Sequence, residues 1–214
     1  MIRPARRCRH PLLPRLARQF AHWVPAIGSR TVLLGVHCAV IHPWFVAWGW
    51  GRLYGRPRDL RLWAAFFLHD IGYWGQLNLD GEQGQRHPEL GGRIMGGLFG
   101  PAWGRFTLYH SRHYARLAGQ PVSPLCAADK LATALYPWWL YGWLAQLSGE
   151  LDSYLDLANA HGFVGRDGRA WFRWLGAQWR DLAYQQAAAV TGPLWPGGPL
   201  LPESGLPLNS HELR

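Results

Sequence analysis

LWAAFFLHDIGYWG, residues 62–75, is an apolar run that ends in a His-Asp pair. Its apolar residues suit a buried helix, and Gly72 stands where such a helix would end. An unpaired carboxylate buried at that point would cost on the order of several kcal/mol, so Asp70 needs a partner. A metal cation would serve, as would a backbone N–H or an arginine. The stretch therefore predicts a helix over 59–70 with His69 and Asp70 as candidate ligands.

Helical periodicity extends over most of the chain, and no alternating stretch flanked by hairpin turns indicates a sheet. We therefore expect an all-α fold. A loop is expected over 72–86, where four glycines and an Asp-Gly turn signal fall together. The expected helices cover residues 31–54, 59–70, 88–98, 101–117, 123–147, 150–161 and 168–190.

The length of 214 residues fits one domain with a substantial core. Three prolines interrupt the Arg-rich first twenty residues, and Pro or Gly recurs at almost every second or third position after Thr191. We expect a flexible basic arm over 1–20, one helical domain over 21–191, and a Pro/Gly-rich tail over 192–214.

The net charge of +9 is concentrated near the N-terminus. Residues 1–58 hold ten arginines and no acidic residue, whereas the remainder holds twelve basic and thirteen acidic residues. Lys130 is the only lysine, so a coding bias toward arginine explains the excess as readily as phosphate recognition does. We expect no nucleic-acid binding beyond the basic arm.

Three cysteines without a CxxC spacing, and the lack of a signal-peptide pattern, favour a reducing cytoplasm. Residues 31–51 and 131–147 are apolar, but two histidines and Pro43 in the first, and the shortness of the second with its Pro137 and Gly142, favour buried helices over membrane spans. The aromatic cluster within the second stretch is expected in the core, with peripheral contact to a membrane surface or a partner chain as the alternative. This cluster comprises Trp138, Trp139, Tyr141 and Trp143.

Three segments, HPWFVA at 42–47, FFLHDIG at 66–72 and LCAADKLATAL at 125–135, resemble in order and spacing the motifs of the HD superfamily. Members of that superfamily are helical metal proteins, mostly phosphohydrolases, so the resemblance implies an HD-type helical bundle. It also implies a metal ion held by His42, His69, Asp70 and Asp129. His37 competes with His42, but the two lie roughly 140° apart around a helix, and Val46 and Ala47 follow His42 as in the motif.

HPELGGRI at 87–94 and the later His110 resemble the elements that bind a second metal in HD-GYP phosphodiesterases. The resemblance implies a second ion on His87 and His110, with Asp70 as a bridge between two divalent ions such as Mn, Fe or Mg. Ser111 and Tyr73 depart from that subgroup, and no GYP triplet follows, so cleavage of cyclic dinucleotides is not expected. An ordinary structural role remains the alternative for both histidines. His113 is expected to be exposed or to lie behind the ligands.

The resulting prediction is an enzyme that hydrolyses a nucleotide or another small phosphate ester. Asp70 would position both ions, and Arg112 and Lys130 would neutralise charge on the phosphate, although a plain helix-surface role is equally open for Arg112. One alternative is a mixed-valent diiron oxygenase, because the ligand order also resembles the type represented by myo-inositol oxygenase. The other is a non-catalytic binding protein with a structural or vestigial metal site.

Overall fold

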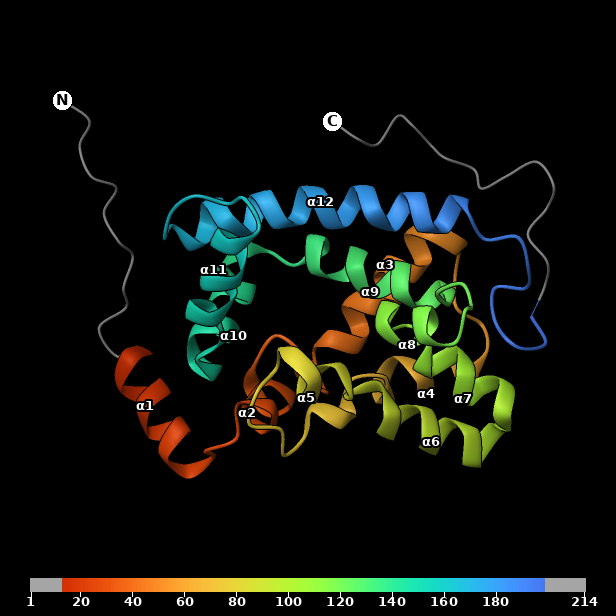
Figure 1. Ribbon diagram of the computed structural model, residues 1–214, viewed down its shortest axis with the longest axis horizontal. Helices are drawn as coiled ribbons and strands as arrows, with labels where there is room; N and C mark the ends of the chain where they lie inside the picture. The colour runs from red at the N-terminus through yellow and green to blue at the C-terminus, as the bar shows by residue number, and fades with distance from the viewer. Residues whose placement is uncertain (1–12, 199–214) are drawn as a thin grey trace.

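The computed structural model describes residues 13–198, and every regular element within them is a helix, which confirms the all-α class (Figure 1). The elements are α1 (Leu13–Trp23), α2 (Ile27–Leu34), α3 (His42–Tyr54), α4 (Leu60–Leu68), the 3-10 turn η1 (Ile71–Tyr73), α5 (Gly81–Gln85), α6 (Pro88–Phe99), α7 (Pro101–Leu108), α8 (Arg112–Leu117), α9 (Pro124–Leu135), α10 (Trp138–Ser148), α11 (Glu150–Ala160) and α12 (Gly168–Ala188).

Helix α9 lies in the middle of the molecule and packs against α3 and α12. The long helix α12 runs along one edge, as Figure 1 shows. Helices α6 and α7 pack against each other at one end, while α10 and α11 lie at the other end with α1 packed against α10. The three helices α3, α4 and α9 therefore share the region between these two ends.

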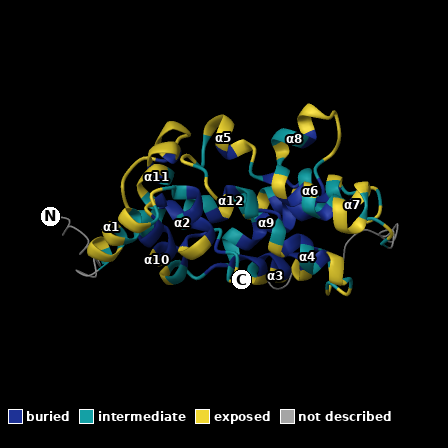
Figure 2. Ribbon diagram, turned by 90° about the horizontal axis from the view of Figure 1, so that it is seen from below, coloured by how far each residue is buried: buried dark blue, intermediate teal, exposed yellow. Residues whose placement is uncertain are grey.

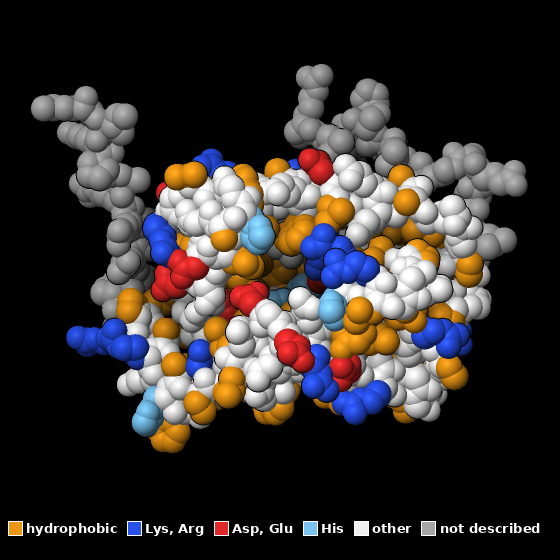
Figure 3. All heavy atoms as spheres, viewed as in Figure 1, with side chains coloured by type: hydrophobic (Ala, Val, Ile, Leu, Met, Phe, Trp, Pro, Cys, Tyr) orange, Lys and Arg blue, Asp and Glu red, His pale blue; other side chains and the backbone are white. Residues whose placement is uncertain are grey.

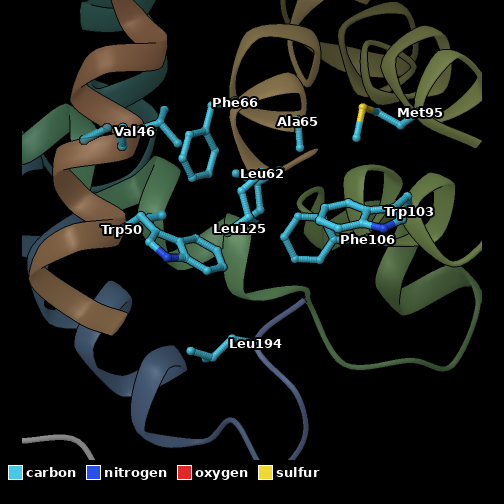
Figure 4. Packing of buried hydrophobic residues seen from close by; sticks show 13 residues of the cluster. Val46, Trp50, Leu62, Ala65, Phe66, Met95, Trp103, Phe106, Leu125 and Leu194 are labelled. Atoms are coloured by element: carbon cyan, nitrogen blue, oxygen red, sulfur yellow. The ribbon is translucent and has the colours of Figure 1, made fainter. Parts of the chain in front are cut away.

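The main hydrophobic core joins α3, α4 and α9 (Figure 4). Trp50, Leu62, Phe66 and Leu125 are fully buried in it. Removing one such side chain from water contributes roughly 1.5–3 kcal/mol, so the core holds these helices in a fixed arrangement. Because His42, His69 and Asp129 lie on or directly after these helices, the core also fixes their relative positions.

Two of the expected helices, 31–54 and 123–147, are wrong as single elements. The first is split into α2 and α3, and Pro43 stands in the first turn of α3, where its fixed φ favours a helix start. The second is split at Pro137, which forces Tyr136 into an extended conformation with ψ 138°. Both breaks change the direction of the chain beside the candidate site.

The expected helix 101–117 is also wrong, because the chain leaves helical geometry between α7 and α8 at residues 109–111. The backbone carbonyl of Tyr109 instead accepts a hydrogen bond from the N–H of Ser123, 2.9 Å away. The expected loop 72–86 is wrong in part, since it contains most of η1 and all of α5.

At the N-terminal end, α1 begins at Leu13, inside the range expected to be an arm. At the other end, Leu194 is buried in the main core and the Trp195 ring lies 6.1 Å from that of Trp50, so the first part of the expected tail packs on the domain. The remainders of the arm and tail, 1–12 and 199–214, lie outside the described residues.

The aromatic cluster expected in the core divides between two environments. Tyr141 is buried and Trp138 is partly buried, its ring 5.6 Å from that of Phe172, whereas Trp139 and Trp143 are exposed. Within residues 13–198, no helix combines the length and the apolar character that crossing a bilayer requires.

Candidate metal centre

Six side chains predicted as ligands converge from separate elements, and all are buried except His87, which is half-buried. His42 is the first residue of α3, and His69 and Asp70 form the turn after α4. The remaining three are His87 directly before α6, His110 between α7 and α8, and Asp129 within α9.

His42, His69, Asp70 and Asp129 form the first group that could hold a metal ion. The Nε2 atom of His42 lies 3.1 Å from Oδ1 of Asp129 and 3.7 Å from Oδ2 of Asp70. The Nε2 atom of His69 lies 3.2 Å from Oδ2 of Asp70 and 3.7 Å from Oδ1 of Asp129. Two imidazoles and one oxygen of each carboxylate thus surround one point.

Asp70, His87 and His110 form the second group. Both imidazole Nε2 atoms lie 3.5 Å from Oδ1 of Asp70 and 3.2 Å from each other. The two oxygens of Asp70 are therefore divided between the groups, with Oδ2 toward His42 and His69 and Oδ1 toward His87 and His110. Asp70 could therefore offer one oxygen to a metal ion in each group.

Three of the four imidazoles are oriented by backbone carbonyls. The Nδ1 atoms of His69, His87 and His110 lie 2.9, 2.6 and 2.6 Å from the carbonyl oxygen three residues earlier. Because a carbonyl only accepts, each Nδ1 carries a proton and donates it. With Nδ1 held in this way, Nε2 is the atom directed at the centre, which is how metal-binding histidines are commonly held.

The donor set also fits metal ions by its spacing and its unsatisfied atoms. Two ligand atoms each about 2.1 Å from one ion lie about 3.0 Å apart at a right angle and about 3.4 Å apart at the tetrahedral angle. The measured separations are close to these values. The buried Nε2 of His69 makes no hydrogen bond within the described part of the chain, although Asp70 is near it. A cation would satisfy that atom.

The two carboxylates are ionised. Burial opposes their charge, but the neighbouring His69 for Asp70, and Lys130 for Asp129, outweigh it and lower both pKa values well below the ordinary value. Burial likewise opposes charge on His69, yet Asp70 and Asp129 raise its pKa to about 10. At His87 burial prevails and lowers the pKa to about 3. A divalent ion would replace the proton on His69 as the partner of the carboxylates.

Lys130 and Arg112, both predicted to act on substrate, lie against the same aromatic ring. The Nζ atom of Lys130 lies 5.3 Å from the ring centroid of Trp179, and the Arg112 guanidinium lies 5.5 Å from it. Lys130 also donates to Oδ2 of Asp129 over 2.7 Å, which leaves Oδ1 for the first group of ligands. Lys130 thus positions a candidate ligand, and Arg112 is placed beside it.

A cavity of about 580 Å³ adjoins the centre. His42, Asp129, Lys130 and Arg112 lie on its wall, and α10, α11 and α12 supply an apolar and aromatic wall. Figure 3 shows the molecule hollowed at this place, with basic side chains beside the opening. The residues of the aromatic wall are Tyr141, Tyr154, Trp171, Trp174 and Trp179.

Sequence reasoning missed a buried carboxylate behind the centre. Glu150 accepts hydrogen bonds from Thr31 Oγ1 at 2.6 Å, Tyr154 Oη at 2.9 Å and the N–H of Val36 at 3.1 Å, and also from the Ser148 hydroxyl. His37, the competitor of His42, lies with Nδ1 3.6 Å from Glu150 and outside both ligand groups. Through Thr31 and Val36, Glu150 therefore holds the chain segment that precedes His42.

Two aromatic rings, those of Tyr73 and His113, lie near the candidate ligands. Tyr73 stacks on His87 with 4.2 Å between ring centroids and 9° between planes, so the residue that departs from the HD-GYP pattern supports a candidate ligand. His113 belongs to neither ligand group; its ring lies edge-on to Tyr114 with 5.3 Å between centroids. No local sequence signal marked the contact of Tyr73 with His87.

The chain was compared with profiles of known protein families, with curated proteins and with solved structures. None of the three comparisons found a match. The architecture and the site rest on the chain's own residues: an all-helical domain whose buried His/Asp groups could hold metal ions.

Proposed function

We propose that the protein is a metal-dependent phosphohydrolase that acts on a small phosphate ester through two metal ions. The observation that carries the proposal is the division of the Asp70 oxygens between two pairs of imidazoles. The resemblance of the motifs around His42, His69 and Asp129 to the HD superfamily supports it. Two divalent ions, when bound here, would supply a nucleophile at neutral pH and neutralise charge on the phosphoryl group.

The chain's own residues would position the ions and bind the substrate phosphate. Asp70 would fix the distance between the ions, and Lys130 would keep one oxygen of Asp129 directed at the first ion. Arg112 stands at the cavity wall, where its guanidinium would bind phosphate oxygens in a bidentate manner. The charge that develops during phosphoryl transfer would thus meet cations already in position.

The cavity favours an ester whose organic part is planar or apolar, such as the base of a nucleotide. Trp171, Trp174 and Trp179 offer ring faces, and Thr133 and Gln178 add a few polar contacts. A volume of about 580 Å³ is in the range of sites that enclose small organic ligands. A large polymer would not fit inside it.

The decisive experiment is a substrate panel assayed with protein purified without a metal-binding tag and supplied with Mn, Mg or Fe. We expect hydrolysis of at least one phosphomonoester, phosphodiester or nucleotide, and loss of it in Asp70→Asn. Arg105→Gln, an exposed arginine in the last turn of α7, is the matched control. No turnover with any metal would contradict the proposal.

Four imidazoles and two carboxylates also suit iron, so a diiron oxygenase is the second candidate. The same preparation separates the two. Bound iron with an electron-paramagnetic-resonance signal that changes on substrate addition, together with oxygen uptake, would favour the oxygenase. Turnover of phosphate esters with Mn or Mg in the absence of oxygen would favour the hydrolase.

A further inference from the structure

Large apolar side chains are exposed on three helices, α3, α4 and α10. The side chains are Trp44 and Trp48 on α3, Phe67 on α4, and Trp139 and Trp143 on α10, which we call the aromatic face; their exposed fractions are 58%, 50%, 37%, 71% and 41%. In Figure 2 the helices α10, α3 and α4 lie in a row along one side, and α5 and α8 lie along the opposite side. Solitary exposed apolar residues are ordinary, but a row of them marks an interaction surface.

The aromatic face follows helix geometry. Trp44 and Trp48 are four residues apart on α3, as are Trp139 and Trp143 on α10, so each pair forms a stripe on one side of its helix. The Trp44 ring lies 5.4 Å from Trp63 and 6.1 Å from Phe67 on α4, which makes the surface continuous between those helices.

The helices that carry this surface have no acidic residue. Neither Asp nor Glu occurs in the sequences of α1, α2, α3, α4 or α10. The short helices α7 and α8 also lack them, whereas α5, α6, α9, α11 and α12 each contain at least one. Arg15 and Arg18 on α1 and Arg52 on α3 are exposed. The row of helices that exposes aromatic rings therefore has exposed arginines at its α1 end and no helical carboxylate to offset them, a charge that complements an anionic surface.

Helix α1, at one end of the row, also carries both apolar and basic side chains. It packs against α10, yet none of its residues is buried. Leu16, Phe20 and Trp23 recur at helical spacing on an apolar stripe, and Arg15, Arg18 and His22 lie outside that stripe. A basic amphipathic helix with an exposed apolar stripe is the form that lies in the interface of a bilayer.

We propose that the aromatic face and α1 dock on the surface of an anionic lipid bilayer. Tryptophan rings favour the level of the headgroups, and arginines are attracted to anionic lipids. A second copy of this chain is a poorer occupant, because a two-fold contact would bring the basic helices of two copies together with no carboxylate from them to pair. The docking is independent of the proposed hydrolysis.

The geometry leaves the cavity accessible in the docked state. Arg112 on α8 and Asp80 directly before α5 lie on the cavity wall, and both helices are on the side opposite α10, α3 and α4 (Figure 2). A substrate would then reach the cavity from water while the aromatic face contacts lipid.

Vesicle co-sedimentation of the full chain tests the proposal. We expect binding to vesicles of phosphatidylcholine with phosphatidylglycerol, weak binding to phosphatidylcholine alone, and loss of binding as salt increases. Trp44→Ser/Trp48→Ser and Arg15→Glu/Arg18→Glu should each weaken binding by about tenfold or more. Brominated lipids should quench less tryptophan fluorescence in the Trp44→Ser/Trp48→Ser variant than in the original chain.

Matched controls lie elsewhere on the surface. Trp74→Ser changes a tryptophan of similar exposure after η1, and Arg173→Glu/Arg180→Glu reverses two exposed charges on α12; both should bind as the original chain does. The proposal is overturned if the original chain ignores anionic vesicles, or if controls and test variants lose binding equally. A concentration-dependent dimer that Trp44→Ser/Trp48→Ser dissociates would assign the aromatic face to a second copy instead.

Discussion

The Nε2 atoms of His87 and His110 face each other at 3.2 Å, although the Nδ1 atom of each ring donates its proton to a backbone carbonyl. Two lone pairs at that distance repel each other unless a cation lies between them and Asp70. Burial lowers the pKa of His87 to about 3, so a proton on that ring is not the cation at neutral pH.

His87→Ala should therefore remove one ion and leave the other. The first group retains all four of its ligands in this variant, so the metal content should fall from two ions per chain to one. Metal analysis by mass spectrometry after gel filtration measures this ratio. His22→Ala, an exposed histidine on α1, is the control and should retain both ions. Loss of both ions in His87→Ala would show that the two groups do not act as separate sites.

Arg112→Gln should lower kcat/KM for a phosphate ester by roughly 10- to 100-fold, the usual scale for a lost charge-assisted contact to phosphate. Arg112→Lys should restore only part of the loss, because an ammonium cannot form a bidentate pair. Metal content should stay at the original value in both variants, since Arg112 belongs to neither ligand group. Unchanged kcat/KM in Arg112→Gln would leave the residue as a surface arginine stacked on Trp179.

Glu150→Leu should destabilise the fold by about 3 kcal/mol or more, because it leaves several buried donors without an acceptor. Burial opposes ionisation of Glu150, but His37, together with the hydroxyls of Ser148 and Thr31, outweighs it and lowers the pKa of Glu150 below the ordinary value. The ionised form therefore stabilises the fold above the pKa of the unfolded chain, and this contribution is lost as the pH falls through the folded pKa. Urea unfolding of the original chain and Glu150→Gln at pH 7 and pH 4 should show a difference that shrinks at pH 4. Asp152→Asn, exposed on the same helix, should change little at either pH.

Metal binding should release protons and strengthen as the pH rises toward neutrality and above. Asp70 and Asp129 raise the pKa of His69 to about 10, so this imidazole carries a proton at pH 7 until an ion displaces it. Isothermal titration calorimetry in two buffers with different ionisation enthalpies measures the released protons, and we expect about one per ion bound at the first group. Equal heats in the two buffers would contradict this.

The sequence predicted which side chains gather at the centre better than it predicted the bounds of the elements that carry them. The order of His42, His69-Asp70 and Asp129 was legible because each lies in a short motif. The interruption of the helix at His110 could not be predicted, because helical periodicity continues from α7 into α8. Only the hydrogen bond between the Tyr109 carbonyl and the Ser123 N–H reveals the turn.

The parts of the site that the sequence did not predict depend on contacts between residues far apart in the chain. Glu150 meets Thr31 across 119 residues, and no pattern in either segment indicates the pairing. Trp179 reaches Lys130 and Arg112 from α12 in the same way. Such contacts depend on how the helices pack, so they become visible only once the fold is known. The end of α4 beside His69 and the placement of Asp129 inside a helix could be expected, but not the start of α3 at His42 or the side chains that hold these elements.

The central proposal is that Asp70 would serve two metal ions, because its two oxygens face different pairs of imidazoles, and metal analysis of Asp70→Ala tests it most directly. The protein is purified without a metal-binding tag, loaded with Mn and passed over a desalting column beside Asp152→Ala, whose carboxylate lies outside both ligand groups. The account predicts two ions per chain in the control and near zero in Asp70→Ala, with the helical circular-dichroism spectrum retained. A folded Asp70→Ala variant that keeps one or both ions would contradict the bridge.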